Sequence, residues 1–404
     1  MDYTKPNSAE GDCDQEQQQQ QEIALVLSRA AAQYGNWKRS HDNPTKYDAP
    51  EHLLSAAACV GSLSLVEYLV KQEQEHCSVS AESDLLETPL SSASRNGHLE
   101  IVRLLLSNGA DWEAGYRGRD AEEERYAYKH GNVWSLQQQF LVGIETPYTV
   151  TVLEAAASKG HEQIVQLLLQ QPSRHNWRSS YSHLRAIRFA AMRGKIDLVR
   201  LLDEEISEFH PLVLKDFWNH TLLATSYSGK TEVIPFLLAK GAQIDYTEFY
   251  ERDHTTVLGF AAFRGHNDTI RLLLENGADI DGGSKSEEVP LLLAAHVYGF
   301  PSTVALLLDK GAPVHPVRSR LLEQAVFFPP LCVIEVLLEK GVHKIREDGG
   351  AAALLPARNE ERQDIVDLFK AYGIVDGKYC VVLTLMFGFS DLAYRKPISC
   401  SRLP

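Results

Sequence analysis

The sequence has little of what marks a catalytic or membrane-spanning chain. Its 404 residues contain no G-x-x-x-x-G-K-[ST], no H-E-x-x-H, no G-x-S-x-G, and no G-x-G-x-x-G after a strand pattern. The usual motifs for phosphate binding, zinc proteolysis, serine hydrolysis and dinucleotide binding are therefore missing. No stretch reaches the roughly 18 uninterrupted apolar residues of a membrane helix. Residues 1–21 also lack the basic and apolar regions of a signal peptide.

Paired cysteines and an excess of positive charge are absent as well. The six cysteines are scattered, without a C-x-x-C pair or a histidine at zinc-finger spacing, so we expect reduced thiols, no metal and no cofactor. The formal net charge of −14 argues against a general binder of nucleic acid or of anionic membranes. These features predict an intracellular protein, cytoplasmic and/or nuclear, with no membrane span.

What the chain does contain is a repeated unit. Residues 88–111 read TPLSSASRNGHLEIVRLLLSNGAD, and residues 256–280 form a similar copy. Thr88 and Pro89 suit the start of a helix that ends near Gly97, and a second helix with a wide apolar face follows. Helices this short are not stable alone, so their apolar faces need neighbours of the same kind. Further copies are marked by central glycines, which are Gly61, Gly97, Gly160, Gly194, Gly229, Gly265 and Gly299.

Two short helices that recur about every 33 residues, with T-P-L at the start, G-H in the middle and L-L-L-x-x-G-A-D at the end, resemble the ankyrin repeat. The resemblance covers about 54–373 and implies an all-α, ankyrin-type α-solenoid of about nine helix-turn-helix repeats with short finger turns. The organisation we predict is a disordered Gln-rich tail at 1–21, a helical N-terminal cap at 22–50, repeats 1–2 at 51–111, an aromatic and charged insertion at 112–147, repeats 3–9 at 148–373, and a C-terminal cap or tail at 374–404.

The copies depart from the family at one position. The usual histidine after T-P-L is replaced by Ser91, Glu154, Arg188, Leu223 and Gly259. Because the local tethers of that histidine cannot form, we expect uneven stability among the repeats rather than a different fold.

Histidines and aspartates recur at fixed places in the unit. His98, His161 and His266 follow central glycines, and we favour the interpretation that each begins the second helix of its repeat over a metal or proton-relay set. Asp111, Asp245 and Asp279 stand at the end of the unit and are interpreted as turn residues.

The insertion at 112–147 is one candidate for a binding site. It mixes arginines and acidic residues with aromatic side chains, among them Trp112, Tyr116 and Trp134. Aromatic and arginine side chains are typical interface anchors, and insertions in repeat arrays emerge as loops on one face. The alternative is a long loop whose aromatic side chains pack on its own repeats, or which is disordered.

A second candidate is a series of cations just before the central glycines. Lys159, Arg193 and Arg264 occupy this position, which in the resembling fold lies near the concave binding surface, beside Tyr227 and Phe263. They would suit an acidic partner, whereas the simpler alternative is that each cation complements a helix dipole. The other partner-binding candidates are Trp177 and Arg178 in a basic-aromatic patch that extends through His183 and Arg185, and Phe249 and Tyr250 in an aromatic finger. The alternative for the basic-aromatic patch is a solvated loop without a partner.

The sequence thus predicts a non-enzymatic, monomeric scaffold that binds a protein partner through finger loops and the concave face of the solenoid. The partner would be acidic or phosphorylated, and no nucleic acid is expected. Two alternatives stay open. One is a substrate adaptor for a ligase or kinase. The other is an accessory factor or enzyme of a metabolic pathway with a pocket near 112–147.

Overall fold

The structure is a computed structural model. It describes residues 50–72, 79–80, 87–113, 151–172, 181–206, 211–250, 253–282, 290–295, 299–314, 321–327, 330–345 and 350–375. The chain divides into two compact units, Met1–Gln243 and Ile244–Pro404. The predicted tail at 1–21 and nearly all of the segments at 22–50, 112–147 and 374–404 lie outside the described residues, so those boundaries stay predictions.

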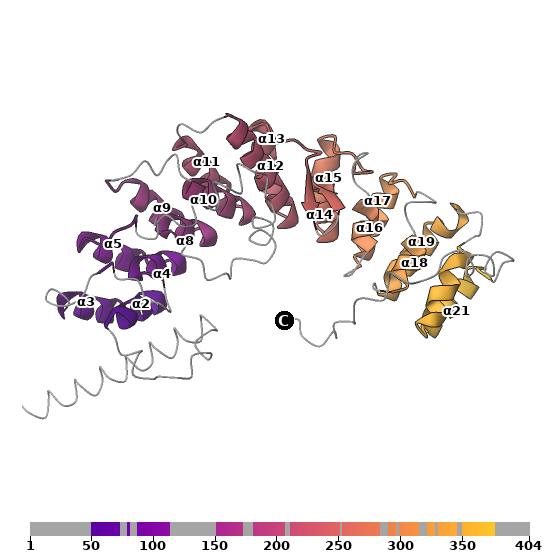
Figure 1. Ribbon diagram of the computed structural model, residues 1–404, viewed down its shortest axis with the longest axis horizontal. Helices are drawn as coiled ribbons and strands as arrows, with labels where there is room; N and C mark the ends of the chain where they lie inside the picture. The colour runs from indigo at the N-terminus through magenta and orange to yellow at the C-terminus, as the bar shows by residue number, and fades with distance from the viewer. Residues whose placement is uncertain are drawn as a thin grey trace, which may run out of the picture. The chain divides into compact units, whose positions relative to one another are not determined.

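In the first unit, helices follow one another as antiparallel pairs (Figure 1). The first helices form one layer, in which α2 packs on α4, α4 on α8, α8 on α10 and α10 on α12. Second helices form another layer, in which α5 contacts both α3 and α9. The pairs are α2 (Pro50–Val60) and α3 (Leu63–Gln72), α4 (Pro89–Asn96) and α5 (Leu99–Ser107), α8 (Val152–Lys159) and α9 (Glu162–Leu169), α10 (Tyr181–Met192) and α11 (Ile196–Glu204), and α12 (Pro211–Tyr227) with η5 (Thr231–Val233) and α13 (Ile234–Ala239).

The second unit begins with a two-stranded antiparallel hairpin, in which Thr247 pairs with Thr256 and Tyr250 with Asp253. Within this unit, helix pairs again stack in two layers, with α14 on α16 and α15 on α17. Its elements are β1 (Thr247–Tyr250), β2 (Asp253–Thr256), α14 (Val257–Phe263), α15 (Asn267–Glu275), α16 (Pro290–Ala295), α17 (Pro301–Asp309), α18 (Leu321–Ala325), α19 (Leu331–Glu339), η6 (Val342–Ile345), η7 (Ala351–Ala353), α20 (Leu354–Asn359) and α21 (Gln363–Ala371). The predicted all-α repeat fold is confirmed, with this hairpin as an addition.

Short polar signals set the limits of the first helices. The Thr88 side chain accepts a hydrogen bond from the Ser91 backbone N–H at 3.2 Å, and Thr151 and Thr256 cap α8 and α14 in the same way. Such a cap contributes about 1 kcal/mol to helix stability. Gly97 then ends α4 in the left-handed conformation, with φ 82°. The predicted start and end of this helix are confirmed.

The core repeats with the helices. In α5, Ile101, Val102 and Leu105 are buried, while Leu104 and Leu106 are half-buried. This i, i+1, i+4 set of buried residues recurs in each later second helix. The equivalent buried sets are Ile164, Val165 and Leu168; Leu198, Val199 and Leu202; Val233, Ile234 and Leu237; Thr269, Ile270 and Leu273; Thr303, Val304 and Leu307; Val333, Ile334 and Leu337; and Ile365, Val366 and Phe369.

Truncating a member of this set should destabilise the first unit. Leu105 is fully buried, so Leu105→Ala should cost about 2–5 kcal/mol of unfolding free energy, because it removes apolar contacts and leaves a cavity. Leu106→Ala is the matched control, since the same atoms are lost from a half-buried site one residue along. Urea unfolding followed by circular dichroism measures both. Equal costs for the two variants would contradict this placement of the core.

Candidate protein-binding surface

The turns between paired helices also join neighbouring pairs. His98 donates a hydrogen bond from Nε2 to the carbonyl of Cys59 in the preceding pair, at 3.0 Å. His161 makes the same bond to the carbonyl of Arg95, also at 3.0 Å. Both histidines stand at the N-cap positions of second helices, as predicted, although neither side chain caps its own helix. Their side chains reach back to the preceding pair instead.

Each of these rings lies over the central glycine of the preceding pair. A Cβ added at Gly97 would stand 2.5 Å from Cε1 of His161, so no larger residue fits without moving the ring. Other side chains fill the same place elsewhere in each unit. The stem of Lys195 lies over Gly160 in the first unit, and the ring of Phe300 lies over Gly265 in the second. The contact therefore depends on the missing Cβ more than on the chemistry of the side chain above it.

In the first unit these turns form a surface that we call the turn surface, consisting of Lys159, His161, Arg193, Lys195 and Tyr227. The side chains of Lys159, Arg193 and Lys195 are exposed, while those of His161 and Tyr227 are half-buried. Arg193 donates from Nε to the carbonyl of Ser158, the residue before Lys159 of the preceding pair, at 2.9 Å. The turns that carry these two predicted site residues are thus in contact.

The hydrogen bond of Arg193 also addresses the alternative that these cations only complement the dipoles of the first helices. Ser158 lies in the last turn of α8, where backbone carbonyls lack partners within the helix. Arg193 satisfies one of them from the neighbouring pair and so stabilises that helix end. The part of the chain that the structure describes places no carboxylate within ion-pair distance of Arg193. The guanidinium therefore has a structural contact without a direct ion pair, and the carboxylate of Glu232 lies over the adjacent Gly194.

The surroundings of His161 lower its pKa. Burial lowers the pKa of His161 below its usual value, while the hydrogen bond to the Arg95 carbonyl raises it. The positive charges of His98, Lys159 and Lys195 lower the pKa further. A further positive charge on His161 would be unfavourable there, and the lowered pKa keeps the ring neutral at physiological pH.

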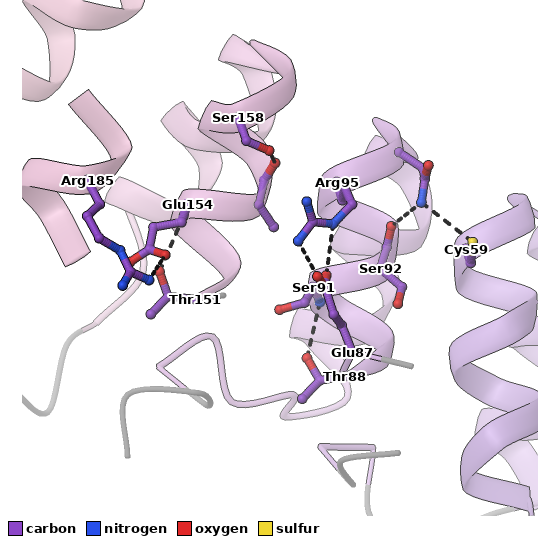
Figure 2. Close-up of polar contacts among 12 residues, drawn as sticks. Cys59, Glu87, Thr88, Ser91, Ser92, Arg95, Thr151, Glu154, Ser158 and Arg185 are labelled. Carbon is purple, nitrogen blue, oxygen red and sulfur yellow. Dashed lines mark hydrogen bonds and ion pairs between the residues drawn. The ribbon is translucent and has the colours of Figure 1, made fainter. Parts of the chain in front are cut away.

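Arg95 stands two residues before Gly97, one position earlier than the cations of the other repeats, and it is placed differently. It forms an ion pair with Glu87, including a bond from Nε to Oε2 at 3.1 Å, and both side chains are largely buried (Figure 2). Its neighbour Asn96 donates to the carbonyl of Ser92 at 2.8 Å and contacts Sγ of Cys59. The charge of Arg95 is thus satisfied within its own repeat, so it is left out of the turn surface.

A buried ion pair replaces the missing histidine tether in the third repeat. Glu154 has no exposed surface, and its carboxylate pairs with Arg185 of α10 (Figure 2). Thr151 accepts from the backbone N–H of Glu154 at 3.3 Å. His183 is also fully buried and donates from Nε2 to the carbonyl of Leu202 at 2.7 Å. The prediction that His183 and Arg185 continue an exposed basic patch is therefore wrong, because both side chains are used in packing.

The remaining predicted site residues are placed as follows. Trp112 is only 8% exposed and donates from Nε1 to the carbonyl of Pro172 at 3.2 Å, so this aromatic packs on its own repeats, as in the alternative for the insertion. In the second unit, Phe263 is half-buried and Arg264 is exposed at the end of α14. Phe249 and Tyr250 lie in β1, and their side chains are not described. Tyr116, Trp134, Trp177 and Arg178 lie outside the described residues.

The described residues also bear on metal sites and membrane spans. Among the described ranges, no group of three or more His, Cys, Asp or Glu side chains is arranged to hold a metal ion. No helix within those ranges is both long enough and apolar enough to cross a membrane. The aspartates at the ends of the repeats act in turns, as Asp111 accepts from the backbone of Glu113 and Asp279 from that of Asp281, each at 3.0 Å.

The neutral state of His161 predicts a pH dependence of stability. Its pKa is lower in the folded state than in the unfolded chain, so the unfolded chain binds more protons as pH falls below about 6.5. This contribution to stability is full above that pH and is lost as pH falls through the folded-state pKa. His161→Phe keeps a ring over Gly97, as Phe300 does over Gly265, and should reduce the loss of unfolding free energy between pH 7.5 and 5.5. Urea unfolding at each pH measures this, and an unchanged pH slope would contradict it.

Comparisons with known proteins agree with this geometry. A family model described as ankyrin repeats matches three copies, over residues 27–115 and 221–318. A probable E3 ubiquitin-protein ligase of rice, XBOS33 (Oryza sativa subsp. japonica), is 27% identical over 201 residues, which are 48% of this chain and 32% of the rice protein. The ankyrin repeat and KH domain-containing protein mask-1 of Caenorhabditis elegans is 29% identical over 197 residues, 48% of this chain and 6% of that protein. This chain is similar to about a third or less of each relative. Ankyrin repeats mediate protein–protein interaction, and residues 27–115 and 221–318 of this chain contain ankyrin repeats.

Proposed function

We propose that the chain is a protein–protein interaction scaffold whose first unit binds an acidic or phosphorylated segment of a partner protein on the turn surface. The observation that carries this proposal is the juxtaposition of Lys159 and Arg193 from adjacent repeats, exposed on a rigid base. Arginine pairs bidentately with carboxylate and phosphate groups, while lysine acts as a point charge. Tyr227 in the next repeat adds an amphipathic ring of the kind enriched at interfaces.

The charges of the turn surface are expected to add more to the specificity and rate of binding than to its affinity. A single exposed ion pair contributes about 0–1 kcal/mol, so several must act together to produce useful affinity. Charge complementarity chiefly speeds association and rejects wrong partners. Since the chain as a whole carries a formal net charge of −14, a local group of cations also gives an acidic partner a defined place to bind.

A second candidate is a substrate-binding part of a ubiquitin ligase, which the rice relative favours by its name. In that role the same surface would hold the protein to be modified. The two candidates differ in what accompanies the bound partner. Ubiquitin transfer to the captured partner, lost when the turn surface is reversed in charge, would support the ligase role. Capture of a partner without transfer would support the scaffold role.

Reversing the cations should weaken partner binding without unfolding the chain. The variant carries Lys159→Glu and Arg193→Glu, and we expect about tenfold weaker binding, from the loss of two attractive contacts and the gain of repulsion. Arg200→Glu is the matched control, because it reverses an exposed charge on α11, away from the turns. Proteins captured by the wild-type chain and both variants are quantified by mass spectrometry, with helical circular dichroism as the folding check. Equal capture by the wild-type chain and the double variant would refute the turn surface as the binding site.

A further inference from the structure

The turn around Gly160 is surrounded by cations from two helix pairs of the first unit. Lys159 precedes this glycine in its own pair. Two more cations reach the turn from the following pair. A Cβ added at Gly160 would stand 2.9 Å from Cε of Lys195, and Arg193 donates from Nε to the carbonyl of Ser158. We call Lys159, Arg193 and Lys195 the Gly160 cluster.

The next turn along the first unit carries a different balance of charge. There a Cβ added at Gly194 would stand 3.3 Å from Cδ of Lys230, but the carboxylate of Glu232 lies over the same glycine. One positive and one negative charge are therefore placed at this turn. At the turn before the Gly160 cluster, the place above the glycine is filled by the ring of His161, whose lowered pKa keeps it neutral. The excess of positive charge around Gly160 is thus not a feature that each repeat shares.

The side chains of the Gly160 cluster still have hydrogen-bond donors to offer. The bond from Nε of Arg193 to the Ser158 carbonyl fixes the guanidinium and leaves the N–H groups of its two terminal nitrogens for another acceptor. The stem of Lys195 packs over the glycine, and its ammonium group is a second donor. Among the described residues, neither Arg193 nor Lys195 forms an ion pair. A fixed guanidinium and an ammonium group are the donors that proteins use to bind phosphate.

We propose that the Gly160 cluster binds one phosphate group, that of a phosphoserine or phosphothreonine in the partner, in preference to a run of acidic residues. Because the cluster is part of the turn surface, the proposal rests on the function proposed above and names the chemistry of the partner. A phosphate monoester carries about −1.5 to −2 charges at pH 7 and three acceptor oxygens, so one group can contact several cations at a single turn. A carboxylate carries a single charge and has fewer oxygens.

The spacing of the turns argues against an acidic run. Packed helices lie about 8–10 Å apart, so an extended peptide along the stack reaches the next turn after about three residues. Its acidic side chains would lie close to the carboxylate of Glu232 over Gly194, and like charges repel. Glu232 therefore favours a partner with one concentrated negative charge over a partner whose charges are distributed along the chain.

The test measures binding of the fluorescently labelled full chain to three sets of immobilised random peptides that differ only at the centre. One set has phosphoserine there, the second has serine and the third has three glutamates. We expect the phosphoserine set to bind about fivefold more tightly than either of the others. If the glutamate set binds as tightly, and Lys159→Glu with Arg193→Glu abolishes the binding of both, the phosphate assignment is wrong while the turn surface stands. Equal binding of the phosphoserine and serine sets would also overturn the proposal.

Two matched variants test where the phosphate binds. Lys195→Gln removes a charge from the Gly160 cluster and should weaken binding of the phosphoserine set about fivefold, the upper value for one exposed ion pair. Lys230→Gln removes the equivalent charge from the next turn, where a carboxylate already lies, and should weaken that binding less than about twofold. Helical circular dichroism checks that both variants fold. Equal losses in the two variants would mean that overall charge holds the peptide, and would overturn the proposal.

Discussion

The stacking depends on a contact between a central glycine and a side chain in the turn of the next helix pair. This contact joins Gly61 to His98, Gly97 to His161 and Gly160 to Lys195 in the first unit, and Gly265 to Phe300 in the second. One helix pair is too short to be stable alone, so stability comes from the register in which pairs stack. Gly97 contributes to that register in two ways. Its positive φ ends α4, and its missing Cβ leaves room for the ring of His161. The hydrogen bond from His161 to the Arg95 carbonyl then holds the ring in place. Packing of the buried aliphatic sets follows from this register.

The same turns supply the proposed binding surface. Lys159 and Arg193 stand at the ends of first helices, where their charges favour the helix dipole and where Arg193 also satisfies the Ser158 carbonyl. The hydrogen bond from Arg193 to the Ser158 carbonyl therefore has two consequences. It joins adjacent repeats, and it holds Arg193 near the end of the helix that carries Lys159. The proposed anionic partner would bind to a surface whose geometry is set before binding, which reduces the entropic cost of recognition.

Much of the fold could be predicted from the sequence, because its signals are local. The Thr88 cap, the Gly97 stop and the burial of Leu105 are encoded within a few residues of one another. The pairing of Glu154 with Arg185 could not be predicted, because it joins side chains in two repeats that no short pattern relates. For the same reason, the hydrogen bond from His161 to the carbonyl of Arg95 in the preceding pair was not among the predictions from the sequence. One signal was available, since histidine at an N-cap, where Ser, Thr, Asp or Asn is expected, indicates that the side chain has another partner.

The role of the central glycine is tested most directly by comparing Gly97→Ala with Gly109→Ala in urea unfolding. Both glycines have a positive φ, 82° and 81°, so each alanine should cost about 1–2 kcal/mol from backbone strain. Only the Gly97 variant also places a methyl group against His161, whereas no atom lies within 4 Å of the corresponding Cβ at Gly109. Gly97→Ala should therefore destabilise the chain by about 1–3 kcal/mol more than Gly109→Ala. Equal losses would contradict the account, because they would mean that the contact over the glycine does not set the stacking of the repeats.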